Sequence, residues 1–433
     1  MLSKEKNQLL CETGPGTPMG ELLRRYWQPV AGVAELDALA PKPVRILGED
    51  LVLYRDRAGT FGLVDRHCPH RRADMSYGFA EEQGLRCSYH GWHFDESGRC
   101  LHQPFEERAH PHARFKEKVE IKAYPVEAKA GLLWAYMGPA PAPLLPDWDR
   151  YYHRGYKQVV LASVPCNWFQ CQENSIDPVN FEWLHTNWSQ VLRGQEGPRG
   201  PAHTRLGFDE FDYGFVYRRV REDTTEADEL WTTGRVCLWP NCLYVGHFEW
   251  RVPIDDENTL SVGWFLDPVP GDEPFEQDTI PCWTAPVADP VTGRWIDTHV
   301  MNQDFVAWVG QGVVADRTRE HLGESDRGIL MMRKKMFEQA EVVRAGGEPV
   351  AVIRDEAMNH RVHLPLIREN VPPPTPPHEI HGSRGDPGTG RRGRGGGQTA
   401  GNTGPPRFPF LAGQPQEVIE DMRRVWAERR AAG

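Results

Sequence analysis

Two short clips of cysteine and histidine constrain this chain more than any other feature of its sequence. The first clip holds Cys68 and His70, and sixteen residues later the second holds Cys87 and His90. Each clip is short enough to lie on one tight loop, so two facing loops would place two thiolates and two imidazoles around a metal centre. Strand and turn patterns on both sides predict a metal-binding β domain.

The pattern of the clips bears on which metal they hold. Mixed Cys/His sets bind either a single tetrahedral zinc or a two-iron, two-sulfide cluster. A zinc finger would carry two histidines a few residues apart on a helix, whereas each clip here has one cysteine and one histidine. This symmetry favours the cluster, and structural zinc stays as the alternative. Because neutral histidines raise the cluster potential, such a centre would accept and relay electrons.

Composition limits the partners and the compartment. The 433 residues suffice for two or three domains, and the formal net charge of -11 argues against a nucleic-acid binder and suits docking to a protein partner. Nine cysteines, an odd number spread along the chain, fit a reducing compartment better than a disulfide framework. Neither a signal peptide nor an apolar run of membrane-spanning length is apparent, so we expect a cytoplasmic protein without a membrane segment.

A second constellation of polar residues follows a strand-like stretch in the second half of the chain. Residues 167–185 read NWFQCQENSIDPVNFEWLH. Asp177 followed by Pro178 is typical of a helix N-cap with proline at the first helical position. Residues five apart, such as Asn180 and His185, are separated on an α-helix by about 140° beyond a full turn. Bringing both side chains to one site therefore requires a distorted helix.

These patterns together resemble the large oxygenase subunits of the Rieske non-heme iron ring-hydroxylating oxygenases, most closely the phthalate dioxygenase type. The resemblance runs from about residue 13 to residue 345, and it includes Gly91 and Trp92 directly after the second clip. It implies a [2Fe-2S] cluster whose ligands are the four clip residues. We expect the bulky indole of Trp92 to shield that cluster from water.

The same resemblance implies a mononuclear iron(II) site. In the family, two histidines of the second motif and a later aspartate, in an N-Q-D pattern, hold the iron. His185 and Asp304 match two of these ligands, but Asn180 stands where the first histidine is expected. An amide oxygen is a much weaker iron(II) ligand than an imidazole, so Asn180 is either a weak ligand or a lost ligand position.

Two further residues of this motif are candidate catalytic residues. By the resemblance, Asp177 links a cluster histidine to an iron-ligand histidine across neighbouring subunits, a role that its N-cap position does not exclude. Asn174 matches the family motif three residues earlier. For a carboxylated aromatic substrate, Arg193 or Arg199 just beyond the motif could pair with the carboxylate, although arginines at such positions are more often surface residues.

The predicted fold class is α+β. We expect an all-β Rieske domain and a catalytic domain with a large antiparallel sheet flanked by helices, of the helix-grip or START-like kind. The predicted boundaries are an N-terminal helical lead that packs on the catalytic domain (1–40), the Rieske domain (41–146), the catalytic iron domain (147–370), a low-complexity Pro/Gly/Arg-rich loop (371–407) and a C-terminal helix (408–433).

By the resemblance, the protein is the terminal oxygenase component of a multi-component system. Electrons would pass from NADH through a flavin and iron-sulfur reductase to the cluster, then to iron in an adjacent subunit of a trimer or of stacked trimers. The iron would use O2 to hydroxylate or oxidatively demethylate an aromatic substrate. Two alternatives stay open: an electron-transfer or substrate-binding protein whose iron site is impaired by Asn180, and a zinc-stabilised structural protein.

Overall fold

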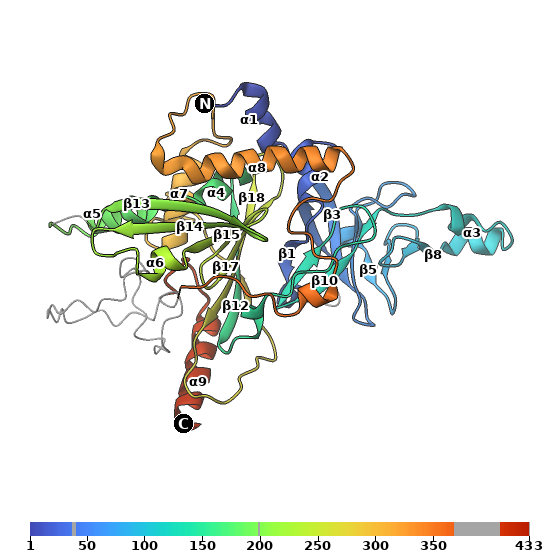
Figure 1. The fold of residues 1–433 in the computed structure, drawn as a ribbon. Helices are drawn as coiled ribbons and strands as arrows, with labels where there is room; N and C mark the ends of the chain where they lie inside the picture. Colours follow the sequence, from blue (N-terminus) through green and yellow to red (C-terminus); the bar gives the residue numbers. More distant parts are fainter. Residues whose placement is uncertain (37–39, 198–199, 368–407, 433) are drawn as a thin grey trace.

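Residues 1–36, 40–197, 200–367 and 408–432 are described by a computed structural model, in which two β-rich domains lie side by side (Figure 1). The predicted α+β class is confirmed, with helices placed mainly around the larger, second domain. The low-complexity segment predicted for 371–407 lies outside the described residues. No described helix is long and apolar enough to cross a membrane, and all nine cysteines are free thiols.

The smaller domain is built from two four-stranded antiparallel sheets. The first contains β2 (Lys42–Ile46), β3 (Glu49–Arg55), β4 (Phe61–Asp65) and β9 (Ala123–Tyr124), and the second contains β5 (Phe79–Ala80), β6 (Leu85–Arg86), β7 (His93–Phe94) and β8 (Cys100–His102). Alternate apolar residues of these strands, such as Val52, Val64 and Phe94, form a core of their own. The short helix α3 (Pro104–Ala109) projects at the edge farthest from the larger domain (Figure 1).

The N-terminal segment connects the two domains. Its helices α1 (Lys4–Cys11) and α2 (Pro18–Leu23) pack beside the long helix α8 (Arg327–Arg344). Thr17 caps α2 by accepting the Gly20 N–H at 3.2 Å, and Pro18 occupies the first helical position. The segment then enters β1 (Gln28–Gly32), which pairs with β11 (Leu132–Ala135) and, through it, with β10 (Val126–Lys129).

The larger domain is organised around one eight-stranded sheet. Its strands, in spatial order, are β13 (His203–Phe211), β14 (Gly214–Arg221), β15 (Arg235–Leu238), β16 (Cys242–Tyr244), β17 (Phe248–Pro253), β18 (Thr259–Asp267), β12 (Tyr156–Val164) and β19 (Cys282–Thr284). All neighbours are antiparallel except β12 and β19, which are parallel. The predicted large antiparallel sheet is thus present, with one parallel pair at its edge.

Both faces of this sheet are covered, because strand residues alternate between two cores. In β12, Val159 and Leu161 belong to the core shared with the N-terminal segment and the smaller domain, whereas Val160 and Ala162 face a second core. The second core includes residues of α7 (Val300–Gly310) and of the predicted C-terminal helix α9 (Gln416–Ala432). Other helices of this domain are α4 (Trp168–Asn174), η5 (Phe181–Trp188), α5 (Ser189–Leu192) and α6 (Glu229–Thr232).

Candidate active site and metal centres

The two clips fold as the same loop. In each, the cysteine N–H donates to the carbonyl five residues later, and the cysteine carbonyl accepts the N–H four residues later. These distances are 2.8 and 2.9 Å around Cys68, and 2.8 and 3.1 Å around Cys87. The turn residues Arg72 and Gly91 both have positive φ, at 61° and 75°, a conformation that favours glycine. The two loops therefore present their cysteines in equivalent positions.

The four clip side chains come together. Cys68 and Cys87 are buried, and the hydrogen bond between their thiols lowers the pKa of Cys87 to about 6. The rings of His70 and His90 have centroids 4.6 Å apart at an interplanar angle of 70°. Trp92 is buried and stacks on His70, with centroids 4.3 Å apart and planes 7° apart. Its indole therefore covers one face of a predicted ligand.

The donor atoms of this site fit a Rieske cluster. The two buried thiols contact each other and the two imidazole rings contact each other, and a cluster with cysteines on one iron and histidines on the other needs the ligands paired in this way. The Nδ1 atom of His70 is buried and has no hydrogen-bond partner among the described residues. An unpaired buried nitrogen is costly, and a metal ion bound there would satisfy it.

The second predicted site is formed where η5 meets α7. His185 and Asp304 are both buried, and the His185 Nε2 lies 3.2 Å from the Asp304 Oδ1. Two ligand atoms about 2.1 Å from one ion, at a right angle, would be about 3 Å apart. The pair therefore has the spacing of two neighbouring ligands of one metal ion. Within the described ranges, no group of three His, Cys, Asp or Glu side chains is arranged to hold a single ion.

Gln303 orients the imidazole of His185. Its Nε2 donates to the Ser189 Oγ at 2.7 Å and to the Asp297 carbonyl at 3.0 Å, so its Oε1 is directed to the His185 Nδ1 at 3.1 Å. This arrangement makes the Nδ1 the protonated nitrogen and leaves the Nε2 lone pair directed towards Asp304. Gln303 is the middle residue of the N-Q-D pattern, and the family resemblance implied no role for it.

Asn180 is the N-cap of the helix that carries His185, and that helix is a π-helix, η5. The prediction that the motif needs a distorted helix is confirmed, because in a π-helix residues five apart are joined by the backbone hydrogen-bond pattern and share a face. The Asn180 Oδ1 is buried and accepts no hydrogen bond from any residue that the structure describes. The Asn180 Oδ1 is therefore an oxygen atom that is available to bind a metal ion, one helical turn before His185.

The two candidate catalytic residues flank this site. The Asn174 Nδ2 donates to the Asp304 Oδ1 at 3.2 Å. The Asp177 Oδ1 accepts the Val179 N–H at 2.9 Å, but the N-cap of η5 is Asn180, so the prediction that Asp177 is the N-cap residue is wrong. Burial raises the pKa of Asp177 to about 6.

Other residues of the motif hold α4 in place. Glu173 forms ion pairs with Arg317 and Arg333, both at 2.6 Å, and Arg333 belongs to α8. The Gln170 Nε2 donates to the Trp308 carbonyl of α7 at 2.7 Å. Because these partners are buried and multiply bonded, they fix α4 and so the position of Asn174.

Two arginines near the metal site were missed by the sequence analysis. The guanidinium carbons of Arg219 and Arg235 lie 4.7 and 4.3 Å from the centroid of the Phe181 ring, and that ring packs on His185 at 5.2 Å. Both arginines are buried in strands of the sheet. When polar residues occur on both faces of a strand, a single sequence does not show which face is directed into the domain. It therefore does not show which arginines are buried.

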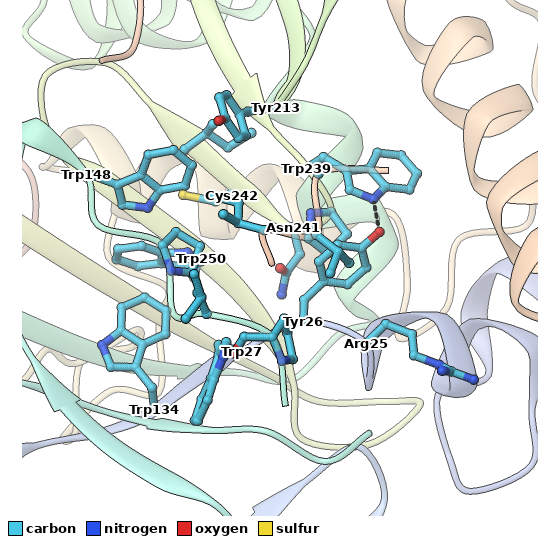
Figure 2. A pocket seen from close by; sticks show the side chains of 18 residues that line it. Arg25, Tyr26, Trp27, Trp134, Trp148, Tyr213, Trp239, Asn241, Cys242 and Trp250 are labelled. Atoms are coloured by element: carbon cyan, nitrogen blue, oxygen red, sulfur yellow. Dashed lines mark hydrogen bonds between the residues drawn. The ribbon is translucent and has the colours of Figure 1, made fainter. Parts of the chain in front are cut away.

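One cavity adjoins the candidate iron site, and another lies at the N-terminal segment. One, of about 740 Å³, is lined by residues of α5 and α7 that include Ser189 and Gln303, and so adjoins the support of His185. The other, of about 50 Å³, lies between the N-terminal segment and the sheet and is lined by tryptophans that include Trp239 and Trp250 (Figure 2). There the Trp239 Nε1 donates to the Tyr26 hydroxyl at 2.7 Å, and this hydrogen bond joins the N-terminal segment to the sheet of the larger domain.

Known protein families match parts of both the smaller and the larger domain. Residues 26–125 match the family of Rieske [2Fe-2S] domains, and residues 292–364 match the family described as LigXa C-terminal domain like. Over 374 residues the chain is 58% identical to the 5,5'-dehydrodivanillate O-demethylase oxygenase subunit of Sphingobium sp., a match that covers 86% of this chain and 88% of that protein. The chain belongs to the Rieske oxygenases, as an oxygenase subunit.

Other relatives agree with this assignment. The phthalate 4,5-dioxygenase oxygenase subunit of Pseudomonas putida is 32% identical over 80% of this chain and 88% of its own. Among solved structures, NdmA of Pseudomonas putida CBB5 has a TM-score of 0.51 at 21% identity, over 76% of this chain and 93% of its own. The terminal oxygenase of carbazole 1,9a-dioxygenase from Novosphingobium sp. KA1 has a TM-score of 0.50 at 19% identity, over 77% and 94%. These two structures show the fold alone.

The family prediction is therefore confirmed. This chain is an oxygenase subunit of an oxidoreductase family, the Rieske oxygenases, whose terminal oxygenases use O2 and electrons supplied by a reductase. Its Rieske domain carries a [2Fe-2S] cluster rather than structural zinc. The family match begins at residue 26, so it includes β1, which pairs with β11 of the same domain.

Proposed function

We propose that this Rieske oxygenase subunit oxidatively demethylates an aromatic methyl ether at an iron(II) site formed by His185, Asp304 and Asn180. The relative at 58% identity is named as an O-demethylase acting on 5,5'-dehydrodivanillate. The observation that carries the proposal is the 3.2 Å approach of the His185 Nε2 and the Asp304 Oδ1, close to the spacing of two ligands of one metal ion.

Asn180 completes the site as the third ligand in this proposal. Its Oδ1 is buried without a hydrogen-bond donor among the described residues, and leaving such an acceptor unpaired costs about 1–3 kcal/mol. A cation bound there would remove that cost. Because the amide is neutral and weakly basic, we expect looser iron binding than with two histidines.

We assign the [2Fe-2S] cluster to Cys68, His70, Cys87 and His90. Both clips are closed by the same pair of backbone hydrogen bonds, which fixes their donors before the cluster binds. Trp92 excludes water from the His70 side of this site, since its ring stacks on that imidazole. The cluster supplies single electrons, delivered to it from NADH through a flavin and iron-sulfur reductase.

The residues around the iron site orient the ligands and limit water. Gln303 keeps the His185 Nε2 unprotonated. The Asn174 Nδ2 holds the Asp304 carboxylate by donating to the Asp304 Oδ1. Bound iron would supply open positions for O2 beside the substrate. The net reaction consumes one methyl ether, O2, two electrons and two protons, and it releases a phenol, formaldehyde and water.

We further propose that electrons cross between subunits of a homotrimer or of stacked trimers. In one subunit the sheet that carries the second clip lies on the side of the Rieske domain away from α4, α5 and α7 (Figure 1). Asp177 sits beside the iron site and would bridge to a cluster histidine of the neighbouring subunit. The free thiols of all nine cysteines support a cytoplasmic location.

Formaldehyde release tests this function. The reconstituted subunit, an NADH-dependent reductase and 5,5'-dehydrodivanillate should yield formaldehyde and the corresponding phenol in equal amounts. His185→Ala should abolish this release while the visible absorbance of the cluster persists. Cluster reduction by the reductase with no product from any methoxylated aromatic compound would refute the proposal.

The second candidate function is an electron-transfer or substrate-binding protein with an impaired iron site. It is favoured by Asn180, a weak ligand where the family motif has histidine. This function predicts that, after addition of iron(II), the subunit contains no iron beyond the two irons of the cluster. The two candidates therefore differ in iron content as well as in activity.

A further inference from the structure

Arg86, at the end of β6, uses all of its hydrogen-bond donors within the Rieske domain. Its Nη1 donates to the Gly91 carbonyl at 2.5 Å and to the His102 Nδ1 at 3.1 Å. Its Nε and Nη2 donate to the two carboxylate oxygens of Glu81, and Nη2 also approaches the His93 Nδ1 at 3.4 Å. A guanidinium has five N–H groups, so these contacts occupy every one of them.

The strand register brings these side chains together. Arg86 of β6 lies opposite His93 of β7, and His93 lies opposite His102 of β8. Residues directly opposite each other in antiparallel strands project on the same face of a sheet and contact each other. The row of one arginine and two histidines is therefore set by the pairing of three short strands.

The contact of Arg86 with Gly91 joins the two ends of the second clip. Arg86 directly precedes the clip cysteine, and Gly91 directly follows the clip histidine. In the first clip the residue before the cysteine is His67, whose Nδ1 lies 3.9 Å from the Asp65 Oδ1. The two clips thus share their backbone hydrogen bonds but differ at this position, because a side-chain cation also holds the second clip.

The ion pair of Arg86 with Glu81 has its cationic side on the clip. Glu81 occupies the Nε–Nη2 edge of the guanidinium, whereas Nη1 contacts the Gly91 carbonyl. The Glu81 side chain is 32% exposed and the Arg86 side chain 15%, so water screens the carboxylate more than the guanidinium. A net positive potential therefore acts on the second clip.

We propose that Arg86 is a positioning residue that raises the reduction potential of the [2Fe-2S] cluster. Reduction adds one negative charge to the cluster, and a fixed positive charge nearby stabilises the reduced form. Glu81 lowers the potential, because it compensates part of this positive charge. The inference rests on the proposed assignment of the cluster to the four clip residues, and it is independent of the iron site.

The test measures the reduction potential of the cluster by spectroelectrochemistry in the purified holoprotein, without reductase or substrate. Arg86→Gln removes the cation and keeps an amide donor, and Glu81→Gln removes the anion while leaving the other contacts of the guanidinium. The matched controls are Arg114→Gln and Glu117→Gln, the two halves of an exposed ion pair in the same domain. The visible absorbance of each variant reports its cluster content.

We expect the two partners of this ion pair to shift the potential in opposite directions. Arg86→Gln should weaken reduction of the cluster about tenfold, a fall of about 59 mV for one electron, and Glu81→Gln should raise the potential. A merely structural role would move both variants in the same direction or leave both unchanged. Both controls should match the natural chain, because solvent and salt screen exposed charges.

Shifts of the same sign in Arg86→Gln and Glu81→Gln, or shifts no larger than those of the controls, would overturn the inference. If Arg86→Gln does not retain the cluster, Glu81→Gln decides, because a raised potential supports the inference and an unchanged or lowered potential overturns it. A natural chain without the visible spectrum of a Rieske cluster would refute the ligand assignment and, with it, this inference. The potential is measured without substrate, so failure of the proposed demethylation does not change it.

Discussion

At position 180 an amide replaces the imidazole of the family motif, and its buried Oδ1 meets no donor among the described residues. At position 303 an amide is fully used, because both of its ends are bonded. These two amides have opposite roles at one site. Gln303 fixes a ligand, whereas Asn180 offers an oxygen that only a cation or an added donor would satisfy.

Substitutions of Asn180 should strengthen or weaken iron binding, depending on the residue that is introduced. Asn180→His supplies the family imidazole, so we expect more iron to survive dialysis against a weak chelator, and Asn180→Leu, which keeps the size but removes the oxygen, should retain less. Iron and acid-labile sulfide per subunit are the measurement. Sulfide should stay constant in both variants, and unchanged iron in both would show that position 180 does not face the metal.

Gln303→Leu should weaken iron binding about 10- to 100-fold, since it removes the acceptor that holds the His185 Nδ1–H. The apparent dissociation constant for iron(II) is the quantity to compare. Gln311→Leu, at the exposed end of the same helix, is the matched control. Equal affinities in the two variants would mean that His185 needs no support from Gln303.

Among the elements, local patterns were predicted well and distant pairings were not. The clip loops, β2 to β4 and the C-terminal helix α9 follow from turn residues and hydrophobic periodicity, which are local. The pairing of β1 with β11 and the parallel pair β12 and β19 join segments about a hundred residues apart. Such pairings depend on packing of the whole domain, so one sequence does not reveal them.

The site shows the same limit. The need for a distorted helix followed from the five-residue spacing of Asn180 and His185, and η5 is a π-helix. The contacts of Phe181 with Arg219 and Arg235 connect η5 to strands β14 and β15. They require knowledge of which strand face meets the helix, which is a tertiary property.

The end of β18 should make stability depend on pH. Burial raises the pKa of Asp267 from 3.8 to about 6, and its Oδ2 accepts a hydrogen bond from the Gln158 Nε2 at 2.9 Å. A folded pKa above the unfolded one means that the carboxyl group costs nothing below about pH 4 and costs up to about 3 kcal/mol above about pH 6.

We therefore predict that Asp267→Asn gains stability relative to the natural chain as the pH rises from 4 to 6, by about 1–3 kcal/mol. Thermal unfolding midpoints at pH 4.5 and pH 7.5 measure this difference. The exposed Asp272→Asn should show no such change. A stability difference that is the same at both pH values would contradict the role of burial.

On the scale of the whole molecule, the subunit places its two proposed metal sites in different domains. The Rieske domain lies on one side and the helices of the iron site on the other (Figure 1). Because the two proposed sites lie in different domains, we infer that the cluster of one subunit delivers its electron to the iron of a neighbouring subunit.

Mixed oligomers test this arrangement. Cys87→Ser should lose the cluster and His185→Ala should lose the iron, so each variant alone should be inactive. When the two are co-expressed and purified together through different tags, we expect partial recovery of formaldehyde release. Inactive mixed oligomers that contain both the cluster and the iron would contradict transfer between subunits.

The most direct test of the central claim, an iron site completed by Asn180 beside a Rieske cluster, is the ratio of iron to acid-labile sulfide after anaerobic reconstitution with iron(II). The account predicts about three irons for every two sulfides, two of the irons belonging to the cluster. Equal iron and sulfide would contradict it and would favour the electron carrier, and zinc without sulfide would contradict the cluster as well.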